Sequence, residues 1–143
     1  WYCRIEVLES DSAFYRPSAD VIVCPQKTQF PKGADYYSTL LHEVAHSTGH
    51  PSRLNRDMSV FFGSPSYARE ELIAEMTAAL CGIRFGLATT PQQENAAYLA
   101  SWLRGLKEKP EYLFDILIDA NKAATMIADR VEESNAKPDE TAA

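Results

Sequence analysis

The sequence HEVAH at residues 42–46 places two histidines and a glutamate within about one helical turn. On an α-helix His42 and His46 lie about 40° apart around the axis, so both imidazoles can reach one metal ion. Glu43 lies on the flank of that face, too far round to be a ligand but within reach of a metal-bound water. Zinc lowers the pKa of such a water toward about 7, and a nearby carboxylate can take its proton as it attacks a carbonyl. The spacing predicts a zinc site for hydrolysis, with Glu43 as the general base.

The same five-residue pattern also occurs by chance on solvated helices. Here the neighbouring residues Leu40, Leu41, Val44 and Ala45 indicate that the helix is partly buried. Buried ionisable groups must be paired or bound. Two histidines and a glutamate on this helix therefore favour a metal site.

A third ligand is needed, and the sequence offers two places for it. His50 follows a turn at Gly49, and a residue directly after a turn cannot easily swing back to the ion, so we expect it beside the site or as an alternative ligand. Glu71 and Glu75 lie one turn apart on one face of the next predicted helix. We expect Glu71 to bind the metal and Glu75 to orient a ligand histidine, with Glu75 as ligand left open. Glu70 points about 100° away from Glu71 and is expected to be solvated or paired with a basic residue.

Short β-branched segments precede the motif and predict two or three strands, at residues 4–9 and 19–24 among them. Prolines flank the second of these segments. If residues 21–23 form an edge strand above the site, an extended peptide could pair with them by strand addition.

Apolar residues at helical spacing then predict four helices, at residues 35–48, 66–85, 90–106 and 110–133. The apolar face expected for the second helix consists of Leu72, Ile73, Met76, Ala79, Leu80 and Ile83. We therefore expect an α+β fold over residues 1–133, in which a small N-terminal β-sheet packs on the HExxH helix and three further helices follow. The composition of residues 134–143 is typical of a flexible C-terminal tail.

Composition narrows the function classes. The chain has 143 residues, 45% of them hydrophobic, and a formal net charge of −6, which argues against bulk electrostatic binding to nucleic acid. No run approaches the roughly 18 to 20 apolar residues of a membrane span, so no membrane partner is expected. The three cysteines are widely spaced and never in Cys-x-x-Cys form, which favours a reducing cytoplasm over a disulfide framework.

Longer stretches resemble a known family. The runs FPKGADYYSTLLHEVAHSTGHPSRLNRD and FGSPSYAREELIAEMTAALCG resemble the zincin-like metallopeptidase domain of ArdC-type antirestriction proteins. The same domain occurs in TraC-type plasmid primases and in polyvalent proteins of plasmids, phages and conjugative transposons. The segments FYRPSADVIVCP and ENAAYLASWLRGLKEKPEYLFDILIDANKAA extend the resemblance over about Ala13 to Val131.

The resemblance implies a gluzincin-like site in which His42, His46 and a glutamate of the EELIAE helix bind zinc and Glu43 acts as base. It also implies that a domain binding single-stranded DNA should precede this one. That domain is absent from this chain, so DNA binding is expected mainly from it. The role proposed for such proteins is the protection of incoming mobile DNA.

Four more residues are candidates for supporting roles. Tyr67 precedes the second helix and is a possible oxyanion donor, whereas Tyr36 is expected to pack the metal helix against its neighbours. Arg53 and Arg56 are expected to tie the loop after that helix to carboxylates such as Asp57, or else to bind an acidic substrate group.

Two functional hypotheses follow, and a third is weaker. The first is a zinc peptidase that acts on a peptide or protein substrate. The alternative is a zinc-stabilised protein- or DNA-binding module of an antirestriction protein, without peptidase activity. A zinc-free relic is the third, and the intact set of His42, Glu43, His46, Glu71 and Glu75 argues against it.

Overall fold

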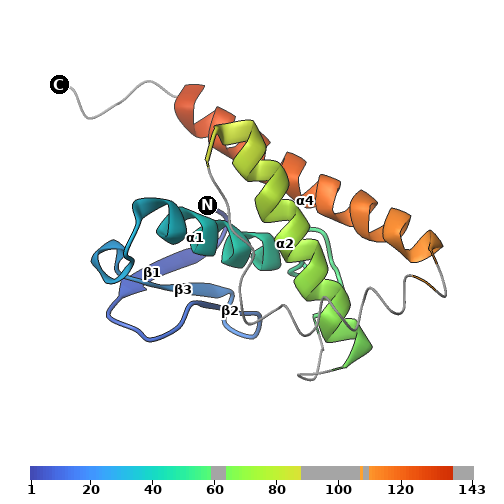
Figure 1. The fold of residues 1–143 in the computed structure, drawn as a ribbon, viewed down its shortest axis with the longest axis horizontal. Coiled ribbons are helices and arrows are strands. Elements are labelled where there is room, and N and C mark those ends of the chain that lie inside the picture. Colours follow the sequence, from blue (N-terminus) through green and yellow to red (C-terminus); the bar gives the residue numbers. More distant parts are fainter. Residues whose placement is uncertain (59–63, 88–106, 108–109, 137–143) are drawn as a thin grey trace.

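A small sheet, a central helix and a pair of long helices lie side by side in the computed structural model, which describes residues 1–58, 64–87, 107 and 110–136 (Figure 1). In chain order the elements are β1 (Arg4–Leu8), β2 (Phe14–Arg16), β3 (Val21–Pro25), the short 3₁₀ helix η1 (Lys27–Gln29), α1 (Gly33–Ser47), α2 (Pro65–Phe85) and α4 (Glu111–Ala136). The expected α+β architecture, with the sheet on the HExxH helix, is confirmed.

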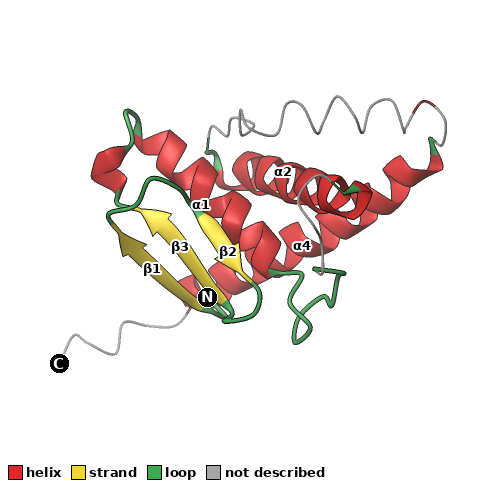
Figure 2. Cartoon of the chain, turned by 90° about the horizontal axis from the view of Figure 1, so that it is seen from below, coloured by secondary structure: helices red, strands yellow, loops and turns green. Residues whose placement is uncertain are grey.

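The sheet has the strand order β1-β3-β2, so the strand at residues 21–25 is central. It pairs parallel with β1 and antiparallel with β2, and Ile22 faces both Ile5 and Tyr15 in the register. All of its residues are buried. The condition for strand addition at residues 21–23 is therefore not met, because a strand paired on both sides offers no free backbone groups. Among the described residues, β2 forms the edge of the sheet beside α1 (Figure 2).

Helix α1 passes between the sheet and α2, and its C-terminal half is buried there. Its N-terminal half is more exposed and carries Tyr36, which makes edge contacts with Phe30 and Tyr37, in agreement with a packing role. The HEVAH segment thus falls on the buried half. The packing of α1 on both sides forces its polar side chains to find partners within the protein.

Helix α2 has the boundaries that the sequence indicates. Ser64 caps it by accepting a hydrogen bond from the Tyr67 N–H, Pro65 occupies the first turn, and Gly86 ends it in the left-handed conformation at φ 67°. Its expected apolar face is only partly correct, because Ile83 is 81% exposed. Small side chains are buried instead, since α2 lies between α1 and α4 and both must approach it closely; these are Ala68, Ala74, Thr77, Ala78, Cys81 and Gly82.

Helix α4 begins directly after Pro110, as expected, and runs parallel beside α2 (Figure 1). It continues to Ala136, so residues 134–136 belong to the helix and not to the predicted tail. The helix expected at residues 90–106 lies outside the described residues. None of the described helices is long and apolar enough to cross a membrane.

Two clusters of buried side chains hold these layers together. The first joins the sheet to the three helices and contains Ile22, Val44, Cys81, Ala124 and Ile127. The second lies between α2 and α4 and contains Ile73, Ile116 and Ala120. Cys3, Cys24 and Cys81 are free thiols in this structure. The fold therefore fixes α1 against α2 by apolar packing on both sides of the HEVAH segment.

Candidate metal centre

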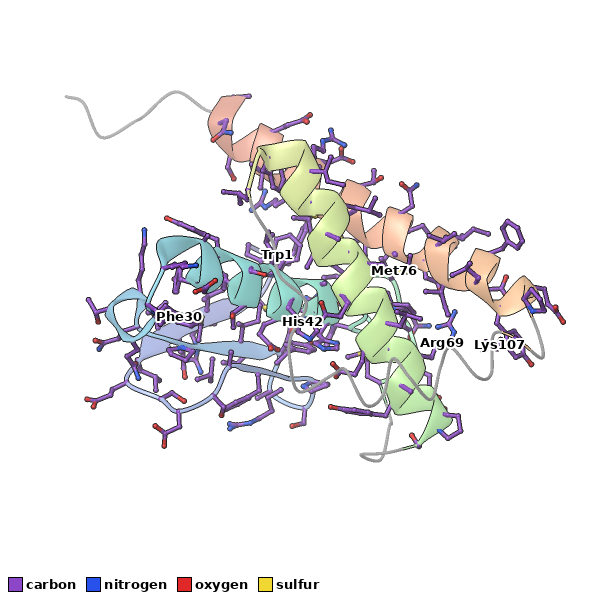
Figure 3. All side chains as sticks on the ribbon, in the orientation of Figure 1. Trp1, Phe30, His42, Arg69, Met76 and Lys107 are labelled. Atoms are coloured by element: carbon purple, nitrogen blue, oxygen red, sulfur yellow. The ribbon has the colours of Figure 1, made fainter. Side chains whose placement is uncertain are left out.

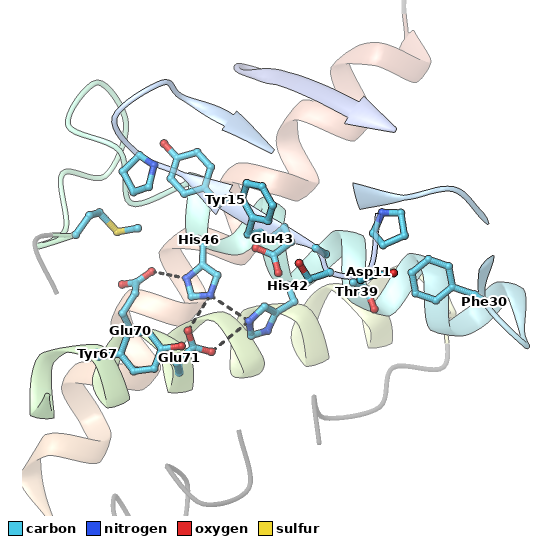
Figure 4. Close-up of a pocket in the computed structure, with 16 residues that line it drawn as sticks. Asp11, Tyr15, Phe30, Thr39, His42, Glu43, His46, Tyr67, Glu70 and Glu71 are labelled. Atoms are coloured by element: carbon cyan, nitrogen blue, oxygen red, sulfur yellow. Dashed lines mark hydrogen bonds and ion pairs between the residues drawn. The ribbon is translucent and has the colours of Figure 1, made fainter. Parts of the chain in front are cut away.

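His42 lies on α1 beside α2 (Figure 3). Together with His46 it faces Glu71 on the first turns of α2 (Figure 4). The two Nε2 atoms are 3.0 Å apart. The Glu71 carboxylate spans both, with one oxygen 3.4 Å from His42 Nε2 and the other 3.4 Å from His46 Nε2. Within the described part of the chain, this is the one group of three or more His, Cys, Asp or Glu residues whose ligand atoms converge so closely.

These separations fit a tetrahedral ion. Ligand atoms that each lie about 2.0 to 2.2 Å from a tetrahedral zinc are about 3.3 to 3.6 Å from one another. The two Nε2 atoms are 3.0 Å apart, each lies 3.4 Å from a different oxygen of Glu71, and one ligand atom from each residue lies within 4.8 Å of the others. Two imidazole nitrogens and a carboxylate are also the ligand set of zinc sites that keep an open fourth position. The residues present therefore fit a divalent metal ion.

The second ring nitrogens of both histidines face further glutamates. His46 Nδ1 lies 3.2 Å from an oxygen of Glu70 at hydrogen-bond geometry. His42 Nδ1 lies 3.5 Å from an oxygen of Glu75, an ion-pair distance, but makes no hydrogen bond with any described residue. Glu75 thus lies beside a candidate ligand histidine, where the sequence analysis expected it. Such partners orient the ring and select the nitrogen that carries the proton.

Sequence reasoning missed the position of Glu70. It is only 4% exposed, and it contacts both His46 and Arg56. The basic partner was expected, but the solvated alternative is wrong. Angles around one helix cannot show that α2 crosses α1, which lets adjacent glutamates contact different atoms of one histidine. The signal in the sequence that could have indicated this position of Glu70 is the pair of consecutive glutamates, Glu70 and Glu71, on the helix that follows the two candidate ligand histidines.

Glu43 lies beside the two imidazoles and is 8% exposed (Figure 4). Burial raises the pKa of its carboxyl above the ordinary value, and the nearby His46 and His42 oppose this rise. The pocket that it lines has a volume of about 550 Å³ and is also lined by Tyr67. A carboxylate of raised basicity beside the converging ligand atoms has the position of a general base.

The histidines and glutamates of the cluster shift one another's pKa values. Burial alone would lower the pKa of His46, but hydrogen bonds with Glu70 and Glu71 raise it to about 10. For Glu71, burial acts to raise the pKa, and the hydrogen bonds with His42 and His46 lower it far below its ordinary value. In this metal-free arrangement, a protonated His46 sits against two carboxylates, so a metal ion entering the site must displace a proton.

The loop after α1 brings the remaining candidates to different places. His50 Nδ1 contacts the Ser52 hydroxyl at 2.7 Å, within a turn outside the convergent ligand atoms. Arg53 pairs with Asp20, and Arg56 pairs with Glu70. The expected ties between this loop and carboxylates are therefore present.

The features described above are an α+β fold, an HExxH sequence on a buried helix and a glutamate from the next helix. Together they define the class of zincin-like domains. Residues 3–118 match the zincin-like metallopeptidase family, and the chain belongs to it. The chain is 50% identical over 114 residues to the DNA primase TraC of Escherichia coli, covering 80% of this chain and 11% of the primase. It is 36% identical over 128 residues to the uncharacterized protein y4eC of Sinorhizobium fredii, covering 90% of this chain and 41% of that protein.

Solved structures give the same assignment. The antirestriction protein ArdC from plasmid R388, in its Mn(II)-bound structure, matches with a TM-score of 0.82 and 39% identity, over 90% of this chain and 48% of ArdC. Its metal-free structure matches with a TM-score of 0.81 and 38% identity, over 92% of this chain and 47% of ArdC. The chain thus spans less than half the length of each of these relatives.

Proposed function

We propose that this domain binds a divalent metal ion, zinc in the first place, through His42, His46 and Glu71 and hydrolyses peptide bonds with Glu43 as general base. The convergence of three ligand atoms within 4.8 Å of one another, with Glu43 lining the same pocket, carries this proposal. The family to which the chain belongs supports it. The Mn(II)-bound structure of ArdC supports a divalent ion without fixing its identity.

The residues of the chain would divide the chemistry among them. A bound ion supplies a Lewis acid, which polarises the carbonyl and acidifies a water molecule. Glu43 accepts the proton of that water and passes it to the leaving amine. Tyr67, in the wall of the same pocket, is the proposed donor to the developing oxyanion.

The substrate would be a peptide or protein segment in extended form. Phe14 and Tyr15 of the edge strand β2 line the pocket, so backbone pairing along β2 would bring a peptide carbonyl toward the site. The apolar part of the lining contains Ala13, Phe14, Pro17, Pro25, Phe30 and Met58. We propose the cytoplasm of a cell that carries a mobile element as the place of action, by analogy with the plasmid proteins above.

The Glu43→Gln variant tests the mechanism. It removes the base but keeps the size and polarity of the side chain, so we expect peptide hydrolysis to fall at least about 100-fold. Zinc content, measured by elemental analysis, should be unchanged, because Glu43 is not a proposed ligand. The assay is cleavage of a mixed peptide library followed by mass spectrometry, with Asp35→Asn, on the first turn of the same helix, as the control. Equal cleavage by Glu43→Gln and by the unmodified protein would refute the proposal.

A structural role for the metal is the second candidate function. An ion held by α1 and α2 would cross-link the two helices between which the site is buried. The relatives are named as a primase and an antirestriction protein, which favours a zinc-stabilised binding module within a longer protein. In that case Glu43→Gln would have no effect on function, whereas removal of the metal would lower the melting temperature or weaken a complex with a partner.

A further inference from the structure

We propose that Arg56 is a positioning residue, which fixes His46 for metal binding through Glu70. This inference rests on the metal site of the proposed function and not on peptide hydrolysis. It assigns a task to the loop of residues 48–58, which supplies none of the candidate ligands.

The Arg56 guanidinium holds Glu70 from two sides. Nε donates to one carboxylate oxygen at 2.9 Å, and Nη2 donates to the other at 2.7 Å. The oxygen that accepts from Nη2 is also the one that lies 3.2 Å from His46 Nδ1. A fork of two parallel hydrogen bonds fixes the plane of the carboxylate as well as its charge. The direction of the bond to His46 is therefore set by Arg56.

The same guanidinium is anchored to the helix that carries His46. Nη1 donates to the Thr48 hydroxyl at 2.8 Å, and Nη2 also donates to the Ala45 carbonyl at 3.0 Å. Arg56 therefore connects the last turn of α1 with the first turns of α2. Its side chain is only 5% exposed, as is that of Glu70. The pair is shielded from water, so its geometry is held more firmly than that of a surface pair.

The backbone conformation of the loop positions Arg56 between α1 and α2. The Arg56 N–H donates to the Gly49 carbonyl at 2.9 Å, and Asn55 has the left-handed conformation at φ 49°. A Cβ atom on Gly49 would lie 2.9 Å from Nη2 of Arg56. The absence of a side chain at Gly49 thus leaves the space that the guanidinium fills.

The two candidate ligand histidines differ in the glutamate partners of their Nδ1 atoms. Glu70 is held by Arg56 and hydrogen bonds to His46, whereas Glu75 lies 3.5 Å from His42 without a hydrogen bond. At Nδ1, therefore, the His46 ring has a hydrogen-bonded partner among the described residues and the His42 ring does not. Removing Arg56 should loosen the Glu70 carboxylate and with it the hydrogen bond that orients the His46 ring.

Arg53 provides a matched control in the same loop. Its side chain is also 5% exposed, it donates to the Ser47 carbonyl of α1 at 2.6 Å, and it pairs with the carboxylate of Asp20. Asp20 accepts from the Tyr15 hydroxyl and lies outside the convergent ligand group. Replacing either arginine removes comparable anchoring of the loop, but only the Arg56 replacement frees a carboxylate that contacts His46.

The test is the zinc affinity of four variants, R56M, R56K, R53M and R53K, measured by competition with a chromophoric chelator. We expect R56M to weaken zinc binding about 10- to 100-fold, the range typical of partners that orient metal ligands. R56K keeps the charge without the fork and should lie between R56M and the unmodified protein. Both Arg53 variants should stay within about twofold. If R56M does not fold, as judged by circular dichroism, the comparison of R56K with R53K decides.

Glu70→Gln adds a second line of evidence. If Arg56 acts through Glu70, the double variant R56M/E70Q should bind zinc no more weakly than the weaker single variant. Equal losses in the Arg56 and Arg53 variants would show general anchoring of the loop and overturn the proposal. Tighter zinc binding by R56M would show that Arg56 acts by repelling the cation, which also overturns it. If the unmodified protein binds no zinc, both proposals fail. Normal zinc binding without peptide cleavage would refute only the hydrolytic function.

Discussion

Two consecutive glutamates, Glu70 and Glu71, have different tasks although they have the same side chain. Glu71 faces the Nε2 atoms of both histidines, and Glu70 faces the other side of the His46 ring. Each carboxylate oxygen of the two glutamates contacts a cationic or hydrogen-bonding partner, as buried carboxylates require. Replacing one of them should therefore not reproduce the effect of replacing the other.

Glu71→Gln should weaken zinc binding more than Glu75→Gln does. Loss of a ligand removes a direct metal bond, whereas loss of an orienting partner typically costs about 10- to 100-fold in affinity. Titration calorimetry on the two variants makes the comparison. If Glu75→Gln were the more damaging, Glu75 would be the third ligand, which is the alternative that the sequence left open.

The pH dependence of metal binding follows from His46. Its pKa is raised from 6.5 to about 10, so the metal-free protein keeps this proton at neutral pH. Because zinc must displace that proton, the apparent affinity should rise about tenfold per pH unit up to about pH 10. Calorimetry near pH 6.5 and pH 7.5 in buffers of different ionisation enthalpy would show about one proton released per zinc. Affinity independent of pH would contradict the assigned protonation.

The same shift has a consequence for the stability of the metal-free protein. A pKa raised on folding stabilises the folded state fully below the unfolded value, 6.5, and this contribution is lost as the pH rises through about 10. We therefore expect the free energy of unfolding without metal to fall between these two values. Chemical denaturation at three pH values across the interval would measure it, and His46→Gln should remove the slope.

At this scale the grouping of the HExxH side chains could be predicted from the sequence, but most of their surroundings could not. The spacing of His42, Glu43 and His46 follows from one helix, and the structure brings Glu71 to them. The roles of Glu70 and Arg56 depend on how a loop and a second helix cross the first. Hydrophobic periodicity describes one element at a time, so it does not show how the loop and the second helix lie against the first.

Among the elements, the loop after α1 depends on a glycine for reasons of space. A Cβ atom on Gly49 would lie 2.6 Å from the Met58 sulfur and 2.9 Å from Arg56 Nη2. Gly49→Ala should therefore destabilise the fold by about 1 to 3 kcal/mol and also weaken zinc binding. Gly86→Ala is the matched control, since nothing lies within 4 Å of its Cβ position and only the left-handed backbone at φ 67° is strained.

Urea denaturation and zinc titration of both glycine variants distinguish the two effects. Gly86→Ala should cost about 1 kcal/mol of stability and leave the zinc affinity unchanged, because it lies at the far end of α2. Normal zinc binding by Gly49→Ala would show that Arg56 can move aside without consequence for the site.

Local signals predicted the elements well, and pairing between elements less well. The ends of α2 are set by Ser64, Pro65 and Gly86, which act through the backbone nearby. The strand order β1-β3-β2 depends on contacts between distant segments, so residues 21–25 were not recognised as the central strand. Their uninterrupted burial is typical of a strand with neighbours on both sides.

At the scale of the whole molecule, metal binding should stabilise the fold. The candidate ligands come from α1 and α2, so an ion would join the two helices. At a free zinc concentration about 100 times the dissociation constant, the gain in unfolding free energy is about 2.7 kcal/mol. Calorimetric melting with zinc and with a chelator tests this, and His42→Ala serves as the control without a shift. An unchanged melting temperature in the unmodified protein would contradict a metal site.

The buried thiols of Cys24 and Cys81 can be used as chemical probes of how the fold opens. Both side chains are fully buried, and burial raises the pKa of each to about 11, so neither access nor thiolate is available in the closed state. A thiol reagent can therefore modify them only when the surrounding layers separate. Cys24 lies in the central strand, and Cys81 lies on α2 against the Ala124 carbonyl of α4. Their two labelling rates would show whether the sheet and the helix pair come apart together or in turn.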